Sequence, residues 1–247
     1  MRLPNLLLVG AQKSGTTWMH QSLSRSQYIF GSTQKELNLF GQPGYSGRLD
    51  DYRSHFKEDA KPSAKYFMES TPHYFHAPNV IHDVANQIRS TIPDVRTMVI
   101  LRNPIERYRS AYIHHMQKGR LAYISQIDAL TDDQIMLSTG LYGKILSHWL
   151  TVFPDIIVLS HDQLRMEPQS VLKQVFSQLH LDCDLDLNSE LHPTHTSEEK
   201  RRSRNWPELP DLTVALRKSL ADFYRDDITL LSGLVDFEVD HWLELDV

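Results

Sequence analysis

The stretch that most constrains the fold is residues 5–20, NLLLVGAQKSGTTWMH, because it joins a strand pattern to a helix pattern through a glycine turn. Four apolar residues, 6–9, predict a buried strand, and the spacing of Met19 and Leu23 predicts that a helix follows. The turn between them carries Lys13 and three hydroxyl side chains. Glycines let backbone N–H groups approach an anion, and the helix N-terminus adds partial positive charge. The stretch therefore predicts a phosphate-binding loop.

The spacing within this loop differs from that of nucleotide triphosphatases. Their pattern places Gly-Lys-Ser/Thr after a first glycine and four further residues. Here Gly15 is followed by Thr16 and Thr17, and Lys13 lies inside the loop. Magnesium-nucleotide hydrolysis is therefore the less favoured function. A plain strand–turn–helix with a surface lysine remains the alternative interpretation.

Strand and helix patterns alternate along the rest of the chain. Further strands are predicted at 65–68, 97–101 and 156–160, and helices at 48–58, 78–91, 105–118, 140–153, 168–180 and 210–234. A long loop is expected at 31–47. Alternation of this kind predicts an α/β fold: a P-loop-like parallel β-sheet with helices on both faces. We find no clean boundary in the sequence and expect a single domain over residues 1–247.

Polar clusters follow three of the predicted strands, at 10–17, 69–73 and 102–110. Because ligands of open α/β sheets bind beyond the carboxyl ends of the strands, these clusters are expected to gather at one edge. Arg102 and Ser110 would suit a phosphate monoester there, since arginine offers a planar fork of donors. An ion pair between Arg102 and Glu106 is the alternative.

Composition narrows the function classes. The net charge of −5 argues against broad nucleic-acid binding. Thirteen scattered histidines and a single cysteine, Cys183, do not form a metal-ligand pattern, and no disulfide can close within the chain, which favours a reducing compartment. No apolar run approaches the roughly 20 residues of a membrane span. The first strand leaves no room for a signal peptide, so a cytoplasmic location is expected if the chain is full length.

Five motifs together resemble a known family. They are GAQKSGTTW (10–18), KELNLF (35–40), ESTPHYF (69–75), LRNPIERYRSAY (101–112) and GLYGKILSHWL…FPDIIVLSHDQL (140–164). This ordered set resembles the sulfotransferases that use 3′-phosphoadenosine 5′-phosphosulfate, nearest to the heparan-sulfate-type and related bacterial branch. The resemblance spans most of the chain and implies the sulfotransferase fold.

The resemblance implies a role for each matching position. The glycine loop would hold the 5′-phosphosulfate, and the basic residues further along would bind the 3′-phosphate and cover the nucleotide. The implied donor-binding residues are Lys13, Ser14, Gly15, Thr16, Thr17 and Trp18 for the first role and Arg102, Ser110, Lys200, Arg201 and Arg202 for the second. A solvated loop at 200–202 is the other interpretation of the basic run. No metal is required by this chemistry.

Catalysis by this family implies in-line transfer of the sulfuryl group to a hydroxyl acceptor, with a carbohydrate as the default. Glu36 matches the catalytic base of the heparan-type branch, Lys13 would stabilise the leaving group, and His73 is the rival base. Lys35 would be a supporting cation. Ser70 stands where the family often carries lysine, so the resemblance does not identify the acceptor. Lipid, acyl-chain or small-alcohol acceptors remain alternatives. A P-loop small-molecule kinase and a non-catalytic nucleotide-binding module are the other function classes.

Overall fold

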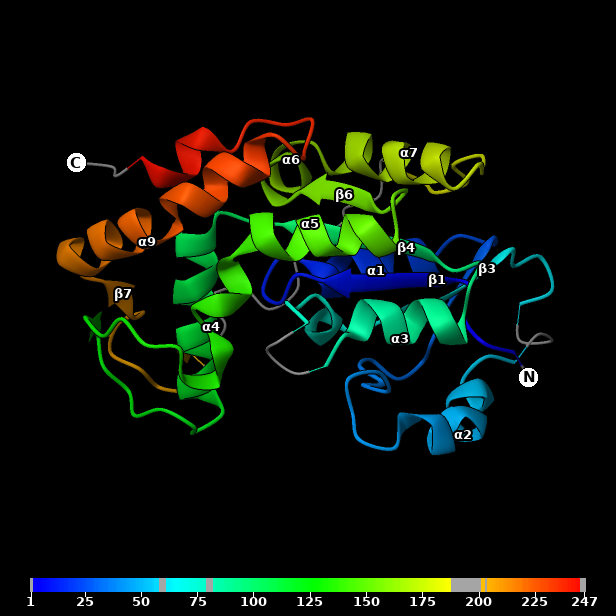
Figure 1. Cartoon of the computed structure of the whole chain (residues 1–247), viewed down its shortest axis with the longest axis horizontal. Coiled ribbons are helices and arrows are strands. Elements are labelled where there is room, and N and C mark those ends of the chain that lie inside the picture. The colour runs from blue at the N-terminus through cyan, green and yellow to red at the C-terminus, as the bar shows by residue number, and fades with distance from the viewer. Residues whose placement is uncertain (1, 58–60, 79–81, 188–200, 203, 245–247) are drawn as a thin grey trace. The chain divides into compact units, whose positions relative to one another are not determined.

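Five parallel strands, in the order β2-β3-β1-β4-β6, form the central sheet. They are β1 (Leu6–Gly10), β2 (Ile29–Gly31), β3 (Tyr66–Ser70), β4 (Arg96–Leu101) and β6 (Ile157–Ser160). The computed structural model describes residues 2–57, 61–78, 82–187, 201–202 and 204–244 (Figure 1). The parallel sheet with flanking helices confirms the predicted α/β fold.

The chain divides into two compact units, Met1–Leu101 with Ser147–Leu191, and Arg102–Leu146 with His192–Val247. The sheet lies wholly in the first unit. The expectation of one domain over 1–247 stays a prediction.

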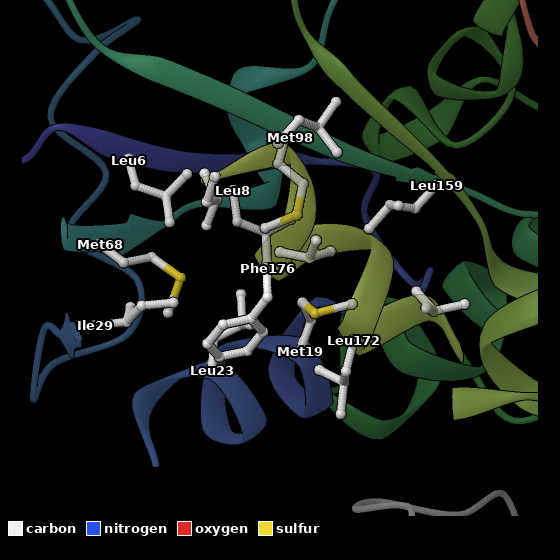
Figure 2. Close-up of a cluster of buried hydrophobic side chains, with 14 of the residues drawn as sticks. Leu6, Leu8, Met19, Leu23, Ile29, Met68, Met98, Leu159, Leu172 and Phe176 are labelled. Atoms are coloured by element: carbon white, nitrogen blue, oxygen red, sulfur yellow. The ribbon is translucent and has the colours of Figure 1, made fainter. Parts of the chain in front are cut away.

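One face of the sheet carries the main hydrophobic cluster of the first unit. Leu6 and Leu8 of β1 and Met98 of β4 point into it, together with Met19 and Leu23 from the helix after the glycine turn (Figure 2). The helices that supply the cluster are α1 (Thr16–Ser24), α6 (His161–Met166) and α7 (Pro168–Gln178). All five residues of β1 are buried, which requires cover on both faces of the sheet.

Two helices lie side by side in front of the sheet in Figure 1, α3 (Val84–Thr91) and the second half of α5 (Tyr142–Val152). The Arg89 guanidinium lies 4.2 Å from the ring centroid of Phe153, and the rings of Phe75 and Trp149 are 5.7 Å apart. Asp83 caps α3 by accepting from the Asn86 N–H. The helix predicted from residue 78 therefore begins at Val84, because its cap fixes that start.

Several short elements differ from the sequence prediction. Residues 31–47 were expected to be loop, yet β2 ends at Gly31 and η1 (Tyr45–Arg48) begins before the end of this stretch. Helix α2 (Leu49–Ser54) confirms the helix predicted at 48–58, in a shorter form. Strand β3 extends to Ser70, since Glu69 pairs with Leu7 and Ser70 with Leu8. His161 begins α6, because the Ser160 hydroxyl caps that helix. A three-residue turn, η3 (Pro72–Tyr74), follows β3.

The second unit is built around α4 (Pro104–Gln117) and α9 (Val214–Ser232). Its remaining elements are β5 (Gln126–Ile127), η4 (Asp133–Ile135), η5 (Ser138–Gly140), β7 (Asp211–Leu212) and η6 (Asp240–Leu243). Asn103 caps α4 and donates to the Trp242 carbonyl at 2.9 Å. Trp242 is 1% exposed, so its side chain anchors this part of the chain in the second unit.

Asp227 on α9 caps the start of α5. Its two carboxylate oxygens accept from the Gly143 N–H at 2.8 Å and the Lys144 N–H at 3.0 Å. We expect Asp227→Ala to lower the free energy of unfolding by about 1–3 kcal/mol, because the buried Gly143 N–H and the partly buried Lys144 N–H lose their acceptor. Urea denaturation measures this change, with Asp226→Ala, an exposed neighbour, as the control. Equal stability of the two variants would contradict the capping role.

Candidate active site

The glycine loop ends β1 and begins α1 in a conformation that opens the helix N-terminus. Gly15 is the N-cap residue with φ 88°, and no side chain caps α1. The first N–H groups of any α-helix lack intrahelical acceptors, so those of α1 can bind an anion. Lys13 also has a left-handed φ, 69°. The loop therefore presents backbone donors and a lysine together.

Ser14 supports the same interpretation from inside the loop. Its side chain is fully buried, and its Oγ has no hydrogen-bond partner among the residues that the structure describes. Buried hydroxyls normally have a partner, so this orphaned hydroxyl fits a loop whose ligand supplies it.

Packing holds the loop in place on two sides. A Cβ on Gly10 would lie 2.5 Å from the Phe75 Cβ, so only glycine fits there, and a Cβ on Gly15 would lie 3.2 Å from Leu164 on α6. Trp18, predicted as donor-binding, packs against the hydrophobic cluster of Figure 2. Thr16 is buried and Thr17 is partly exposed at the start of α1.

Glu36 lies in the segment between β2 and η1, where its Oε1 is 3.5 Å from the Lys35 Nζ. The Glu36 side chain is 31% exposed and the Lys35 side chain 15%. Burial lowers the pKa of Lys35, whereas the charge of Glu36 raises it. The structure thus places a reachable carboxylate beside a mostly buried ammonium group.

Glu69, at the end of β3, is the most buried carboxyl of this region, with no exposed surface. Its Oε1 accepts a hydrogen bond from the Thr71 hydroxyl. Burial raises the pKa of Glu69 to about 7, and the Thr71 hydroxyl and the Leu37 N–H oppose that rise. Lys35 also lowers the pKa of Glu69, so this acid and the Lys35–Glu36 pair form one electrostatic cluster.

His20 is a member of this cluster that sequence reasoning missed. Its Nδ1 lies 2.7 Å from the Ser70 Oγ and its Nε2 lies 3.2 Å from the Ser32 carbonyl oxygen. Burial, and then the charge of Lys35, lower the pKa of His20 to about 4. The signal for it was its place one turn after Thr16 on the buried face of α1.

His73, the rival base, lies beside the glycine loop. Its Nε2 is 3.3 Å from the Gln12 Nε2, and its ring centroid is 6.1 Å from that of His76. The two candidate bases therefore have different neighbours: His73 contacts the loop, and Glu36 contacts Lys35.

A pocket of about 220 Å³ opens beside the segment that carries Glu36. Leu37 and Tyr52 supply apolar walls, and Arg48 donates to the Leu39 carbonyl at 3.3 Å. The complete lining is Gln34, Leu37, Leu39, Arg48, Asp51, Tyr52 and His55. Its polar and aromatic lining is suited to a ligand that carries hydroxyl groups.

The remaining predicted residues lie in the second unit. The Arg102 Nη2 is 3.9 Å from the Glu106 Oε2, a loose pair, while the Glu106 Oε1 accepts from Arg217 at 2.9 Å. Ser110 is partly exposed on α4. Glu106 is thus bound more closely by Arg217 than by Arg102.

The predicted basic run is only partly described. Arg201 donates to the carbonyl oxygens of Trp206 and Pro207, each at 3.4 Å, and Arg202 is exposed. Lys200 lies outside the described residues.

Within the described residues, no group of three or more His, Cys, Asp or Glu side chains could hold a metal ion. Across the same part of the chain, no helix is both long and apolar enough to cross a membrane.

Comparisons with known proteins agree on one family. Residues 3–229 match the family described as sulfotransferase domain. The human bifunctional heparan sulfate N-deacetylase/N-sulfotransferase 2 is 27% identical over 70% of this chain and 22% of its own length. The Xenopus laevis bifunctional heparan sulfate N-deacetylase/N-sulfotransferase 1 is 28% identical over 99% of this chain and 29% of its own length. The chain therefore spans less than a third of these relatives.

Solved structures share the fold. The crystal structure of a sulfotransferase from Alicyclobacillus acidocaldarius superposes with a TM-score of 0.76 at 21% identity, covering 99% of this chain and 100% of that one. The sulfotransferase domain from the curacin biosynthetic pathway gives a TM-score of 0.56 at 12% identity, covering 92% and 98%.

Proposed function

This chain belongs to the sulfotransferase family, and we propose that it transfers the sulfuryl group of 3′-phosphoadenosine 5′-phosphosulfate to an acceptor hydroxyl. The observation that carries the proposal is the uncapped N-terminus of α1 with the buried, unpartnered Ser14 hydroxyl beside it. An anionic phosphosulfate would supply the acceptor oxygens that both groups lack among the described residues.

The glycine loop binds the 5′-phosphosulfate in this proposal. Sulfuryl transfer resembles phosphoryl transfer, in which in-line displacement passes through a loose transition state and charge gathers on the leaving oxygen. Lys13 and the first N–H groups of α1 would stabilise that charge, because fixed donors in a water-poor site need no reorganisation. The residues assigned to this role are Lys13, Ser14, Gly15, Thr16 and Thr17, with Trp18 holding α1 against the core.

Arg102 and Ser110 are assigned to the 3′-phosphate. Support comes from the family resemblance and from the geometry of arginine, whose planar fork matches a phosphate. Lys200, Arg201 and Arg202 are assigned to the cover of the nucleotide.

Glu36 is assigned as the general base. It would accept the proton of the acceptor hydroxyl while the acceptor oxygen bonds to sulfur and the bond from sulfur to the phosphate oxygen breaks. The partial exposure of Glu36 supports the role, since a substrate can reach its carboxylate. His73, next to Gln12, is the alternative base.

A carbohydrate is the proposed acceptor class, bound in the pocket beside Glu36. The names of the relatives refer to heparan sulfate, and the polar lining with Arg48 and Asp51 suits sugar hydroxyls. Those names also specify N-sulfotransfer. An acceptor screen should therefore test each hydroxyl acceptor beside the corresponding amine. We place the reaction in a reducing compartment such as the cytoplasm, which suits the free thiol of Cys183.

We expect 3′-phosphoadenosine 5′-phosphate to stabilise the protein without metal. At 100 times its dissociation constant, a ligand adds ~2.7 kcal/mol to the free energy of unfolding. Thermal melts with this nucleotide in a chelator test the proposal, and Lys13→Ala should lose the stabilisation whereas Lys173→Ala, an exposed lysine on α7, should keep it. Stabilisation by magnesium-ATP alone would instead identify a small-molecule kinase. Nucleotide binding with no transfer across the acceptor screen would identify a non-catalytic module.

A further inference from the structure

The segment that carries Glu36 is fastened to the end of β3 by backbone hydrogen bonds. The Asn38 N–H donates to the Thr71 Oγ1 at 3.2 Å, and the Leu39 N–H donates to the Tyr74 hydroxyl at 2.9 Å. Both acceptors are side chains that follow β3 directly. The position of Glu36 therefore depends on how this end of β3 is organised.

Glu69 is the ionisable group at the centre of that attachment. Thr71 donates to the Glu69 Oε1 with the same hydroxyl that accepts from Asn38, so one hydroxyl connects the acid to the segment. The Leu37 N–H also lowers the pKa of the Glu69 carboxyl. The Glu69 Oε2 has no hydrogen bond of ordinary geometry among the described residues. A glutamine at this position would have only one side-chain oxygen to accept from the Thr71 hydroxyl and the Leu37 N–H.

Lys35 connects Glu69 to Glu36 electrostatically. Its ammonium group pairs with Glu36 at 3.5 Å, and the charge of Glu69 also acts on it. Two carboxyls that share one mostly buried cation restrain each other's charge and position. A fully buried carboxyl is costly to keep, so its presence here calls for a role other than stability.

We propose that Glu69 is a positioning residue for Glu36, which anchors residues 35–39 to the end of β3 through Thr71 and shares Lys35 with the base. The proposal rests on the assignment of Glu36 as the base. Glu69 touches neither donor nor acceptor in this role and acts only through the segment that carries Glu36.

Amide hydrogen exchange tests the anchor without any substrate. Glu69→Gln should make exchange at Leu37, Asn38 and Leu39 about tenfold faster, because one donor loses its acceptor. Thr71→Val, which keeps the carboxyl group of Glu69, should give the same acceleration at Asn38. Amides of α7 serve as the internal control and should be unchanged. Unchanged exchange at 37–39 in both variants would overturn the anchor.

A double-mutant cycle tests whether the anchor acts through the base. With 35S-labelled donor and a heparan oligosaccharide that carries free hydroxyl groups as probe acceptor, Glu69→Gln should lower kcat about tenfold and leave the KM for the donor unchanged. In a Glu36→Gln background, the same substitution should change kcat less than about twofold. An equal loss in both backgrounds would overturn the positioning role and indicate a general structural defect.

The two experiments separate this inference from the proposed function. Full transfer by Glu36→Gln would overturn the base assignment, and with it the role of Glu69 toward a base. An inactive Glu36→Gln, with unchanged exchange in Glu69→Gln, would overturn the anchor alone.

Discussion

Glu36→Gln is expected to lose transfer by ~10²–10⁴-fold while it still binds 3′-phosphoadenosine 5′-phosphate, since this is the usual contribution of a general base. Glutamine preserves the size of the side chain but cannot accept the acceptor proton. The groups proposed to bind the phosphates, such as those of the glycine loop, lie elsewhere in the sequence, so nucleotide affinity should change little. Initial rates with labelled donor and calorimetric titration of the nucleotide measure the two quantities separately.

His73→Gln is the matched control for this experiment. His73 also lies close to β3, and its Nε2 is 3.3 Å from the Nε2 of Gln12 in the glycine loop. We therefore expect His73→Gln to have a modest effect on donor affinity. Loss of transfer in His73→Gln with full activity in Glu36→Gln would move the base role to the histidine. Similar losses of kcat in both would mean that neither residue acts alone as base.

Local patterns in the sequence predicted the part of the site that is local in structure. The glycine loop, β1 and α1 occupy one continuous stretch, so apolar periodicity and turn chemistry were sufficient to place Lys13 and Ser14. The start of α4 was equally predictable, because Pro104 at the first helical position and the Asn103 cap are short-range signals.

The missed features depend on contacts between distant residues. Strand β2 has three residues and exists because Ile29 pairs with Tyr66, which no periodicity in so short a run can reveal. His20 and Ser70 meet although fifty positions separate them. Glu69 was predicted to follow a strand, and only its pairing with Leu7 shows that it lies inside β3. The electrostatic cluster of Glu69, Lys35, Glu36 and His20 could therefore be found only from the fold.

The second large effect concerns stability against pH, to which Glu69 and His20 contribute with opposite signs. The pKa of Glu69 is about 7 in the fold against 4.5 for an ordinary glutamate. The folded state therefore binds more protons than the unfolded state between these values, and stability falls as pH rises through this window, by roughly 3 kcal/mol. The groups that act on Glu69 are Thr71, the Leu37 N–H, Glu36 and Lys35, and its charge acts in turn on Tyr52 and Tyr74.

His20 acts in the reverse direction. Its pKa is about 4 in the fold against 6.5 for an ordinary histidine, so the unfolded state binds more protons and stability rises between these pH values. Lys35, the Ser32 carbonyl and Ser70 are the groups that face it. In the native protein the two contributions largely cancel from pH 4.5 to 6.5, and only the decline due to Glu69 remains above that range.

Glu69→Gln should remove the decline and leave the contribution of His20. The variant should gain stability relative to the native protein as pH rises from 4.5 to 7, by roughly 3 kcal/mol across that range. His20→Asn should show the opposite difference between pH 4 and 6.5. Urea unfolding at half-unit pH steps measures both differences, and subtraction of the native curve removes all titrations that the proteins share. Parallel curves for Glu69→Gln and the native protein would mean that Glu69 titrates near its ordinary value, in which case burial does not hold it neutral.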